Sequence, residues 1–410
     1  MKFSKLSQLF LVSAMGLLVA TLLSSCEIVT IDYIFVASSN GSGASSAGQI
    51  QTYDADSETG ALRSGQPAVP SGGTNPVAMA VTSDYTNLYV ANAGNSSVVH
   101  FALNSNGVLT QKDTVTAINT PVAIAINAAN TYLYVVSGTT SATLTAYPLS
   151  SGTIGAPLTP IQLTVPGFAG DTIIPTAVTV LANNNAVYVA AYDQSAYNPG
   201  GTTTSTANPG WVFGFAIGSS GALSPISTGS PAVAVSPWKA GIKPSAIAAD
   251  PTSRFVYITD FASSQLIGYS IQSGSVLNFL IDGPFRTGNE PSAITIDPRG
   301  KYIYITNSLD STVSAYTIDL STGNPSVVTN TTGNAANATD TQPVAVLVDA
   351  ALGRFVYTAN RLGDDISGFE INTDTGAMSP TQATPYPAGA NPAAIISVPH
   401  GNHAIQSTAP

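Results

Sequence analysis

The chain has 410 residues and a formal net charge of −10 at neutral pH, and 8% of its residues are charged. An acidic chain that lacks a basic cluster is not expected to bind nucleic acid. The single cysteine, Cys26, excludes a disulfide framework.

The N-terminal segment has the features of an export signal. Lys2 and Lys5 precede the apolar stretch 9–23, and the segment ends in Leu23-Ser24-Ser25-Cys26, which resembles a bacterial lipobox. No later apolar run reaches the ~18 residues that a membrane-spanning helix needs. We therefore expect cleavage before Cys26 and lipidation of its thiol. The alternative interpretation of Cys26 is an incidental thiol.

Four segments are expected along the chain: a signal peptide at 1–25, a lipidated linker at 26–30, one folded domain at 31–400 and a tail at 401–410. Two or more acyl chains on Cys26 would hold the protein in the cell envelope. Glu27 follows the cysteine, which favours the outer membrane. The lipid anchor would be the protein's sole link to a membrane.

A repeated pattern fixes the architecture of the folded domain. Short apolar runs begin at Pro76, Pro121, Pro175, Pro244, Pro291, Pro343 and Pro392. After the first six runs comes a strand centred on an aromatic residue: Tyr89, Tyr134, Tyr188, Tyr257, Tyr304 and Tyr357. The seventh such strand lies at the other end of the chain, around Phe35.

A period of roughly 45–50 residues with four strands per unit is typical of β-propellers. The pattern predicts an all-β, seven-bladed β-propeller with four antiparallel strands per blade. The N- and C-terminal strands would pair in one blade and close the ring, which removes open sheet edges.

Third strands alternate as half-buried strands do, for example at 98–103 and 313–318, and a glycine-containing turn follows each of them. Glycine permits the positive φ of a tight hairpin. The aromatic residues of the second strands are expected to pack between blades. A stacking ladder for a sugar is the alternative.

The connections on one face of this propeller vary widely in length. They include residues 38–48, 159–174, 192–211, 224–243 and 324–342. Variable loops on a rigid scaffold often carry binding sites, so we expect the site on this face, around the axial funnel. Neutral drift of surface loops is the alternative.

The repeat predicts two rings of residues at the mouth of this funnel. The residues before the repeat prolines form the first ring: Asn75, Thr120, Ile174, Lys243, Glu290, Gln342 and Asn391. The residues that end the second strands form the second: Ser38, Asn92, Ser137, Ala191, Asp260, Asn307 and Asn360.

Charged residues in or beside these rings are Glu290, Lys243, Asp260 and Arg361. A carboxylate and two cations around a polar funnel could hold an acidic or sugar-like ligand. The alternative is that Asn and Asp at strand ends satisfy backbone groups in turns.

The mature chain resembles the lactonase-type, 6-phosphogluconolactonase-like propellers and the related YVTN-repeat propellers. The resemblance is strongest at GRFVYTANRLGDDISGFEINTDTGAMSP (353–380) and GKYIYITNSLDSTVSAYTIDLSTG (300–323). The family's Asn-Arg pair after a strand-two aromatic matches Asn360-Arg361, which implies a functional role for Arg361.

The chain also departs from that family. The strand starts at which family members carry histidines read Pro175-Thr-Ala and Pro244-Ser-Ala in this chain. The family's Asp-Leu-Gly-like run is replaced by Asp260-Phe261-Ala262, and its arginine after the last repeat proline is replaced by Ala393. These departures weaken the case for the family's activity.

Two functional hypotheses remain open. The favoured one is an exported, monomeric module that binds a small molecule, a glycan or an envelope protein without catalysis. The alternative is hydrolysis of an extracytoplasmic lactone or sugar derivative, with Glu290 or Asp260 as base and Arg361 or Lys243 as anion stabiliser. No cofactor is required, although oxygen ligands from Glu290 and Asp260 would suit Ca²⁺.

Overall fold

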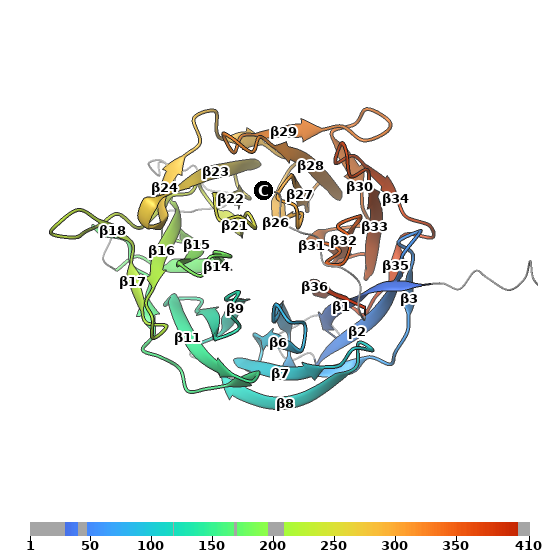
Figure 1. Cartoon of the computed structure of the whole chain (residues 1–410), viewed down its shortest axis with the longest axis horizontal. Coiled ribbons are helices and arrows are strands. Elements are labelled where there is room, and N and C mark those ends of the chain that lie inside the picture. The colour runs from blue at the N-terminus through green and yellow to red at the C-terminus, as the bar shows by residue number, and fades with distance from the viewer. Residues whose placement is uncertain (1–28, 40–46, 118, 168–169, 196–208, 401–410) are drawn as a thin grey trace, which may run out of the picture.

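Seven β-sheets stand around a central axis like the blades of a propeller (Figure 1). The computed structural model describes residues 29–39, 47–117, 119–167, 170–195 and 209–400. Each blade contains four antiparallel strand positions from the axis outward, so the predicted fold is confirmed. The strands follow chain order in six blades, and in the seventh the C-terminal strand is innermost. In six blades two short strands share the fourth position, since both pair with the third strand. No helix among these residues has the length and apolar character to cross a membrane.

The first four blades follow the repeat along the chain. Blade 1 contains β5 (Pro76–Val81), β6 (Asn87–Asn92), β7 (Ser97–Leu103) and β8 (Leu109–Thr116). Blade 2 contains β9 (Pro121–Ile126), β10 (Tyr132–Ser137), β11 (Thr143–Ser150), β12 (Thr153–Ile154) and β13 (Ile161–Gln162). Blade 3 contains β14 (Ile173–Val180), β15 (Ala186–Asp193), β16 (Gly210–Ile217), β17 (Leu223–Pro225) and β20 (Trp238–Lys239). Blade 4 contains β21 (Pro244–Ala249), β22 (Phe255–Asp260), β23 (Gln265–Gln272), β24 (Val276–Phe279) and β25 (Phe285–Arg286).

The remaining blades complete the ring. Blade 5 contains β26 (Pro291–Ile296), β27 (Tyr302–Asn307), β28 (Thr312–Ile318), β29 (Pro325–Val328) and β30 (Ala336–Ala338). Blade 6 contains β31 (Pro343–Val348), β32 (Phe355–Asn360), β33 (Asp365–Ile371), β34 (Met378–Pro380) and β35 (Tyr386–Pro387). Blade 7 contains β36 (Pro392–Pro399), β1 (Thr30–Ser39), β2 (Ala47–Asp56), β3 (Leu62–Ser64) and β4 (Val69–Thr74). Outside the blades lie the hairpin β18 (Ser227–Thr228)–β19 (Val233–Ala234) and the 3₁₀ turn η1 (Ser273–Ser275).

Pairing between the two ends of the chain closes the ring. Strand β1 pairs with β36 from Asp32 opposite Pro399 to Ser38 opposite Pro392. The predicted closing blade is thereby confirmed. An antiparallel partner on each side leaves β1 without a free edge.

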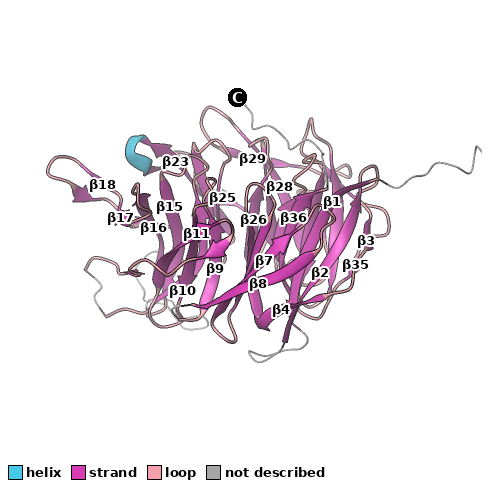
Figure 2. Cartoon of the chain, turned by 60° about the horizontal axis from the view of Figure 1, so that its bottom comes forward, coloured by secondary structure: helices cyan, strands magenta, loops and turns pink. Residues whose placement is uncertain are grey.

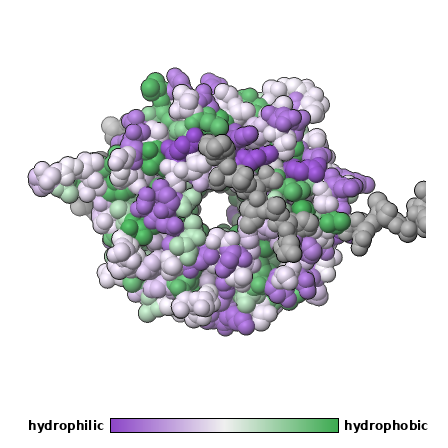
Figure 3. All heavy atoms as spheres, in the orientation of Figure 1, coloured by the Kyte–Doolittle hydropathy of each residue, from purple (hydrophilic) through white to green (hydrophobic). Residues whose placement is uncertain are grey.

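The two faces of the ring differ in their connections. The turns between first and second strands and between third and fourth strands lie on one face, which we call the turn face. The connections between second and third strands and between blades lie on the other, which we call the loop face. Figure 2 shows the 3₁₀ turn on the turn face at the top, and in Figure 3 the axial channel opens on this same face.

The hydrophobic core lies between the blades. Seven clusters of buried side chains each draw residues from two neighbouring blades. The second-strand tyrosines lie fully buried in these clusters, which confirms that they pack between blades. A blade that buries its faces against two neighbours gains its stability from the ring.

A repeated hydrogen bond ties neighbouring blades together. Tyr257 donates its hydroxyl hydrogen to Gly323 O of the next blade at 2.6 Å, and Tyr357 donates to Gly60 O at 2.7 Å. Tyr89, Tyr188 and Tyr304 make the matching bond to the next blade's turn. A buried hydroxyl needs such a partner, so the turn carbonyl and the tyrosine together fix the spacing of the blades.

Candidate functional site

The first predicted ring lies where the innermost strands begin on the loop face. All seven of its members are half-buried: Asn75, Thr120, Ile174, Lys243, Glu290, Gln342 and Asn391. Their position at the starts of seven converging strands makes them the rim of the channel mouth. We refer to these seven residues as the rim.

A shared backbone conformation and backbone hydrogen bonds hold the rim residues in place. Asn75, Glu290, Gln342 and Asn391 all have positive φ, between 50° and 59°. The carbonyl of Glu290 accepts the N–H of Ser308 at 2.9 Å, and the carbonyl of Gln342 accepts the N–H of Arg361 at 2.8 Å. A non-glycine residue with positive φ persists where surrounding contacts fix it.

Hydrogen bonds to two successive carbonyl groups fix the backbone at Glu290. The Ser308 hydroxyl also donates to Glu290 O, at 3.0 Å, and the next residue, Pro291, accepts the Ser245 hydroxyl of blade 4 at 2.6 Å. Among the described residues, the Glu290 carboxylate takes part in no ion pair. The backbone is therefore fixed while the acid group is available to a ligand.

Arg361 follows the second strand of blade 6, beside the rim. Partial desolvation at this position lowers the pKa of Arg361 from its ordinary value, although the residue as a whole is exposed. The guanidinium stays charged near neutral pH. No ion pair with Glu290 forms among the described residues, so both charges can meet a ligand.

Lys243 lies against aromatic rings on the rim. Its ammonium nitrogen is 4.5 Å from the centroid of the Phe261 ring and 5.8 Å from that of Tyr192. Such cation–π contacts hold a flexible ammonium group in place. Tyr192 and Phe261 were not among the predicted site residues, although both directly follow strand-two ends in the sequence.

The second predicted ring differs from the expectation. Asn92, Asn307 and Asn360 are each 0% exposed. Asn360 donates to Asp365 Oδ1 at 2.6 Å and to the Ser367 hydroxyl at 2.8 Å, and Asn307 donates to Thr312 and Ser314. The side chains of Asn307 and Asn360 turn into their own blades, whereas Asn92 accepts from the Ser71 hydroxyl at 2.7 Å and donates to Ser71 O at 3.3 Å on β4 of blade 7. All three side chains satisfy polar groups and do not face the funnel.

Asp260 is likewise committed to its own blade. The residue is 0% exposed, and its carboxylate accepts the backbone N–H groups of Ile242 and Lys243, both at 2.9 Å. Gln265 adds a side-chain hydrogen bond at 3.1 Å. Asp260 therefore anchors the segment that carries Lys243, and the expected role as a base is not supported by this geometry.

A carboxyl pair beside Arg361 escaped the prediction from sequence. Burial raises the pKa of Asp365 to about 6. The neighbouring Asp340 and Asp364 raise this pKa further, whereas the hydrogen bond from Asn360 lowers it. Hydrogen bonds from Thr341 and from Asp365 lower the pKa of Asp340. The doublet Asp364-Asp365 shortly after Arg361 was the signal in the sequence.

The third-strand histidine His100 does not contribute to the rim. His100 is buried between Asp113 at 2.6 Å and Asn87 at 2.8 Å, away from the rim. The described residues contain no group of three or more His, Cys, Asp or Glu side chains that could hold a metal ion. Cys26 and the signal segment lie outside the described residues.

A comparison with protein families matches residues 104–405 to a model described as a lactonase, seven-bladed β-propeller. A search of curated proteins finds no match. Among solved structures, a periplasmic gluconolactonase of Pseudomonas aeruginosa has a TM-score of 0.71 at 15% identity, with 90% of this chain and 99% of that chain covered.

Two similar structures come from Bacteroides. The candidate 6-phosphogluconolactonase of Bacteroides uniformis has a TM-score of 0.69 at 17% identity and covers 90% of this chain and 100% of its own. The one from Bacteroides fragilis has a TM-score of 0.66 at 18% identity and covers 90% and 98%. At such identities these likenesses establish the fold.

Proposed function

The chain belongs to the lactonase family of seven-bladed β-propellers, and from this membership we propose that it binds a small acidic or sugar-derived ligand at the rim of its axial channel. The observation that carries the proposal is the state of Glu290 and Arg361. Both are charged groups on or beside the rim without an ion-pair partner among the described residues. By contrast, the nearby Asp260, Asn307 and Asn360 are buried and hydrogen-bonded within their own blades.

The charges around the rim define the ligand chemistry. Arg361 presents a planar guanidinium suited to bidentate binding of a carboxylate, and Lys243 adds a second cation. Glu290 can accept hydrogen bonds from hydroxyl groups of the same ligand. A hydroxylated carboxylic acid, such as an aldonic acid, fits this combination.

Lactone hydrolysis is the second candidate, favoured by the presence of a carboxylate, Glu290, and a guanidinium, Arg361, that have no ion-pair partner among the described residues. Glu290 would activate water as a general base, and Arg361 would stabilise the negative charge that develops on the carbonyl oxygen. Binding without turnover remains the primary proposal because Asp260 is fully buried and no histidine of the described residues lies on the rim.

The test uses the chain from Glu27 onward with gluconate and with D-glucono-δ-lactone as probes. Calorimetry measures binding, and proton release measures hydrolysis. The variants are Glu290→Gln and Arg361→Ala, with the exposed Arg63→Ala on β3 as a control for loss of a positive charge. Loss of one charged hydrogen bond is expected to weaken gluconate binding by about 10- to 100-fold in Arg361→Ala.

Each outcome separates the two candidates. Binding that falls in Arg361→Ala, with no lactone turnover above background, supports the binding module. Turnover that falls at least about 100-fold in Glu290→Gln supports the hydrolase, because removal of a general base typically costs this much. If the folded protein neither binds gluconate nor opens the lactone, the rim proposal fails.

We also propose that the protein acts outside the cytoplasm as a lipoprotein. The lipobox-like Leu23-Ser24-Ser25-Cys26 supports this location, and so does the similarity to a periplasmic enzyme. Fatty-acid labelling of cells that express wild type or Cys26→Ala tests the anchor. Label on wild type alone is expected; label on neither protein would contradict the proposal.

A further inference from the structure

Glycines in the outer turns of the turn face are covered by side chains from the preceding blade. These turns join the third and fourth strands of each blade, and every such glycine has positive φ, as the sequence predicted. A Cβ atom added to Gly323 would lie 2.5 Å from the ring of Phe255. The same holds at five other boundaries, where the covering residues are Tyr33 over Gly107, Asn87 over Gly152, Tyr132 over Gly221, Tyr302 over Gly376 and Phe355 over Gly60.

The boundary between blades 3 and 4 breaks this pattern. Nothing lies within 4 Å of a Cβ atom added to Gly274. The covering position, two residues before the strand-two tyrosine, is held by Ala186, which is too short to reach the turn. The length of the turn does not set this boundary apart, since Gly152 follows Tyr147 by the same five residues as Gly274 follows Tyr269, yet Asn87 covers Gly152.

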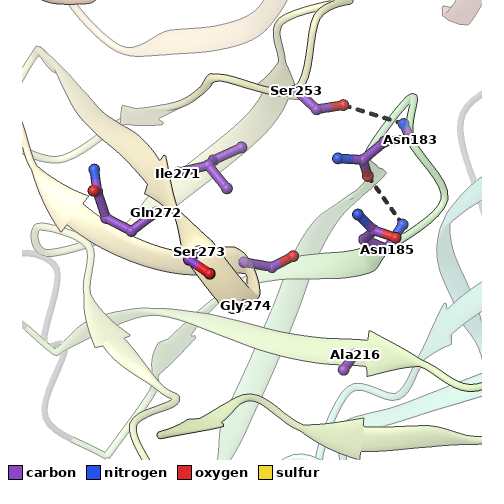
Figure 4. Close-up of a pocket in the computed structure, with 9 residues that line it drawn as sticks. Asn183, Asn185, Ala216, Ser253, Ile271, Gln272, Ser273 and Gly274 are labelled. Carbon is purple, nitrogen blue, oxygen red and sulfur yellow. Dashed lines mark hydrogen bonds between the residues drawn. The ribbon is translucent and has the colours of Figure 1, made fainter.

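A cavity of about 390 Å³ occupies this boundary (Figure 4). We call it the blade 3–4 cavity. Its volume lies in the range of small-molecule sites. Its lining comprises Asn183, Asn185, Ala216, Ser253 and residues 271–275.

Hydrogen bonds fix the polar wall of this cavity. Ser253 accepts the backbone N–H of Asn183 at 3.2 Å, and the Asn183 side chain accepts the backbone N–H of Asn185 at 3.0 Å (Figure 4). On the opposite wall, Tyr188 donates its hydroxyl hydrogen to Ser275 O at 2.5 Å. Both walls are therefore tied to the rigid core of the ring.

The chemistry of the lining is polar but uncharged. Side-chain amides come from Asn183, Asn185 and Gln272, and hydroxyl groups come from Ser253 and Ser273. Ala216 and Ile271 supply apolar surface between them. Amides and hydroxyls both donate and accept, which suits the hydroxyl groups of a neutral ligand, whereas an anion or cation would find no opposite charge.

We propose that the blade 3–4 cavity binds a neutral saccharide ring. The ring takes the place that a side chain of the preceding blade occupies at the other six boundaries. Its apolar face lies against Ala216 and Ile271, and the amides of Asn183 and Asn185 hold its hydroxyl groups. The site lies on the turn face, opposite the rim, so it is independent of the function proposed for the rim.

The test is saturation-transfer NMR on the chain from Glu27 onward with D-glucose, D-galactose and N-acetyl-D-glucosamine as probes. At least one is expected to bind with millimolar affinity. Ala216→Phe extends a ring into the cavity and is expected to weaken binding at least about 10-fold. Asn185→Ala removes an exposed amide that has no hydrogen-bond role in the wall, and a weakening of about 3- to 10-fold is expected from one lost hydrogen bond.

Two controls separate this site from others. Ser220→Ala alters a second surface cavity at the boundary of blades 2 and 3, and Arg361→Ala alters the rim; neither is expected to change saccharide binding. The proposal is overturned if no probe binds at a concentration about 50 times the expected Kd of ~1 mM. It is also overturned if the Ala216→Phe and Asn185→Ala variants both fold and both bind the probe as tightly as wild type.

Discussion

At the scale of single residues, proton sharing beside the rim makes the stability of the fold depend on pH. Asp365 has a pKa raised to about 6 by burial and by the neighbouring acids Asp340 and Asp364. Hydrogen bonds from Thr341 and from Asp365 lower the pKa of the neighbouring Asp340. The protonated form of Asp365 is thus the one that the fold favours.

The sign of the pH effect follows from this raised pKa. The contribution of Asp365 is complete below its unfolded pKa, near 4, and is lost as the pH rises through about 6. Asp365→Asn keeps a donor for Asp340 at every pH, so the variant is expected to melt above wild type at pH 8 and to converge with it near pH 4.

Melting temperatures measured from pH 4 to pH 8 check this prediction. The exposed Asp374→Asn removes one negative charge from the same blade and serves as the control. If the melting temperatures of wild type and Asp365→Asn differ by the same amount at every pH, then Asp365 and Asp340 share no proton.

Single positions also mark where prediction from sequence ends. The repeat places Asn391 and Asn360 equally well on the loop face, yet Asn391 is half-buried on the rim and Asn360 is fully buried. Each of their blades has a register shift next to the repeat proline, between Pro343 and Ala345 in blade 6 and between Ala37 and Ser38, opposite the start of β36, in blade 7. The repeat gives the position along the strand, but the side-chain direction depends on this bulge.

At the scale of elements, two matched substitutions can measure how much the contact between an outer turn and the preceding blade restricts the turn residue. Gly274 and Gly323 have similar φ, 73° and 81°. Alanine at Gly274 meets open space, whereas alanine at Gly323 meets the Phe255 ring. The backbone strain is shared, so the difference between the variants isolates the contact between blades.

Gly274→Ala is expected to lower the free energy of unfolding by about 1–2 kcal/mol, the cost of a left-handed conformation for alanine. Gly323→Ala is expected to lose a further 1–3 kcal/mol, because overpacking forces the ring or the turn to move. Urea denaturation of both variants and wild type gives the values. Equal losses would mean that the turn moves away from Phe255 at no cost.

Most first, second and third strands were predictable because each combines a fixed spacing with a strong apolar pattern. The short outer strands could not be predicted, because each has two or three residues and no periodicity: β13, β20, β25, β30 and β35. The blade 3–4 cavity also escaped prediction. Its origin is the small residue Ala186 in one blade at the position that would cover Gly274 of the next blade, and a repeat alignment alone does not connect these two positions.

At the scale of the whole molecule, the ring depends on the pairing of its two ends. Without β36, the inner edge of β1 would lose the strand that pairs with it from Asp32 to Ser38. The buried β1 side chains Ile34 and Val36 would also lose packing against the innermost strand. An unpaired, apolar strand edge favours association with other chains.

Two C-terminal deletions test this dependence in the chain from Glu27 onward. Removal of residues 401–410 leaves β36 and the bond from His400 N to Ile31 O, at 2.8 Å, in place, so this protein is expected to elute as a monomer and to unfold at the wild-type urea concentration. Removal of residues 391–410 is expected to give oligomers or aggregates in size-exclusion chromatography with light scattering, and to broaden the urea transition.

A synthetic peptide of residues 391–400 added in excess should restore part of the monomer, because it supplies the missing strand. A monomer with a sharp transition after the longer deletion would mean that six blades hold their arrangement without closure, and that the terminal pairing is dispensable for the ring.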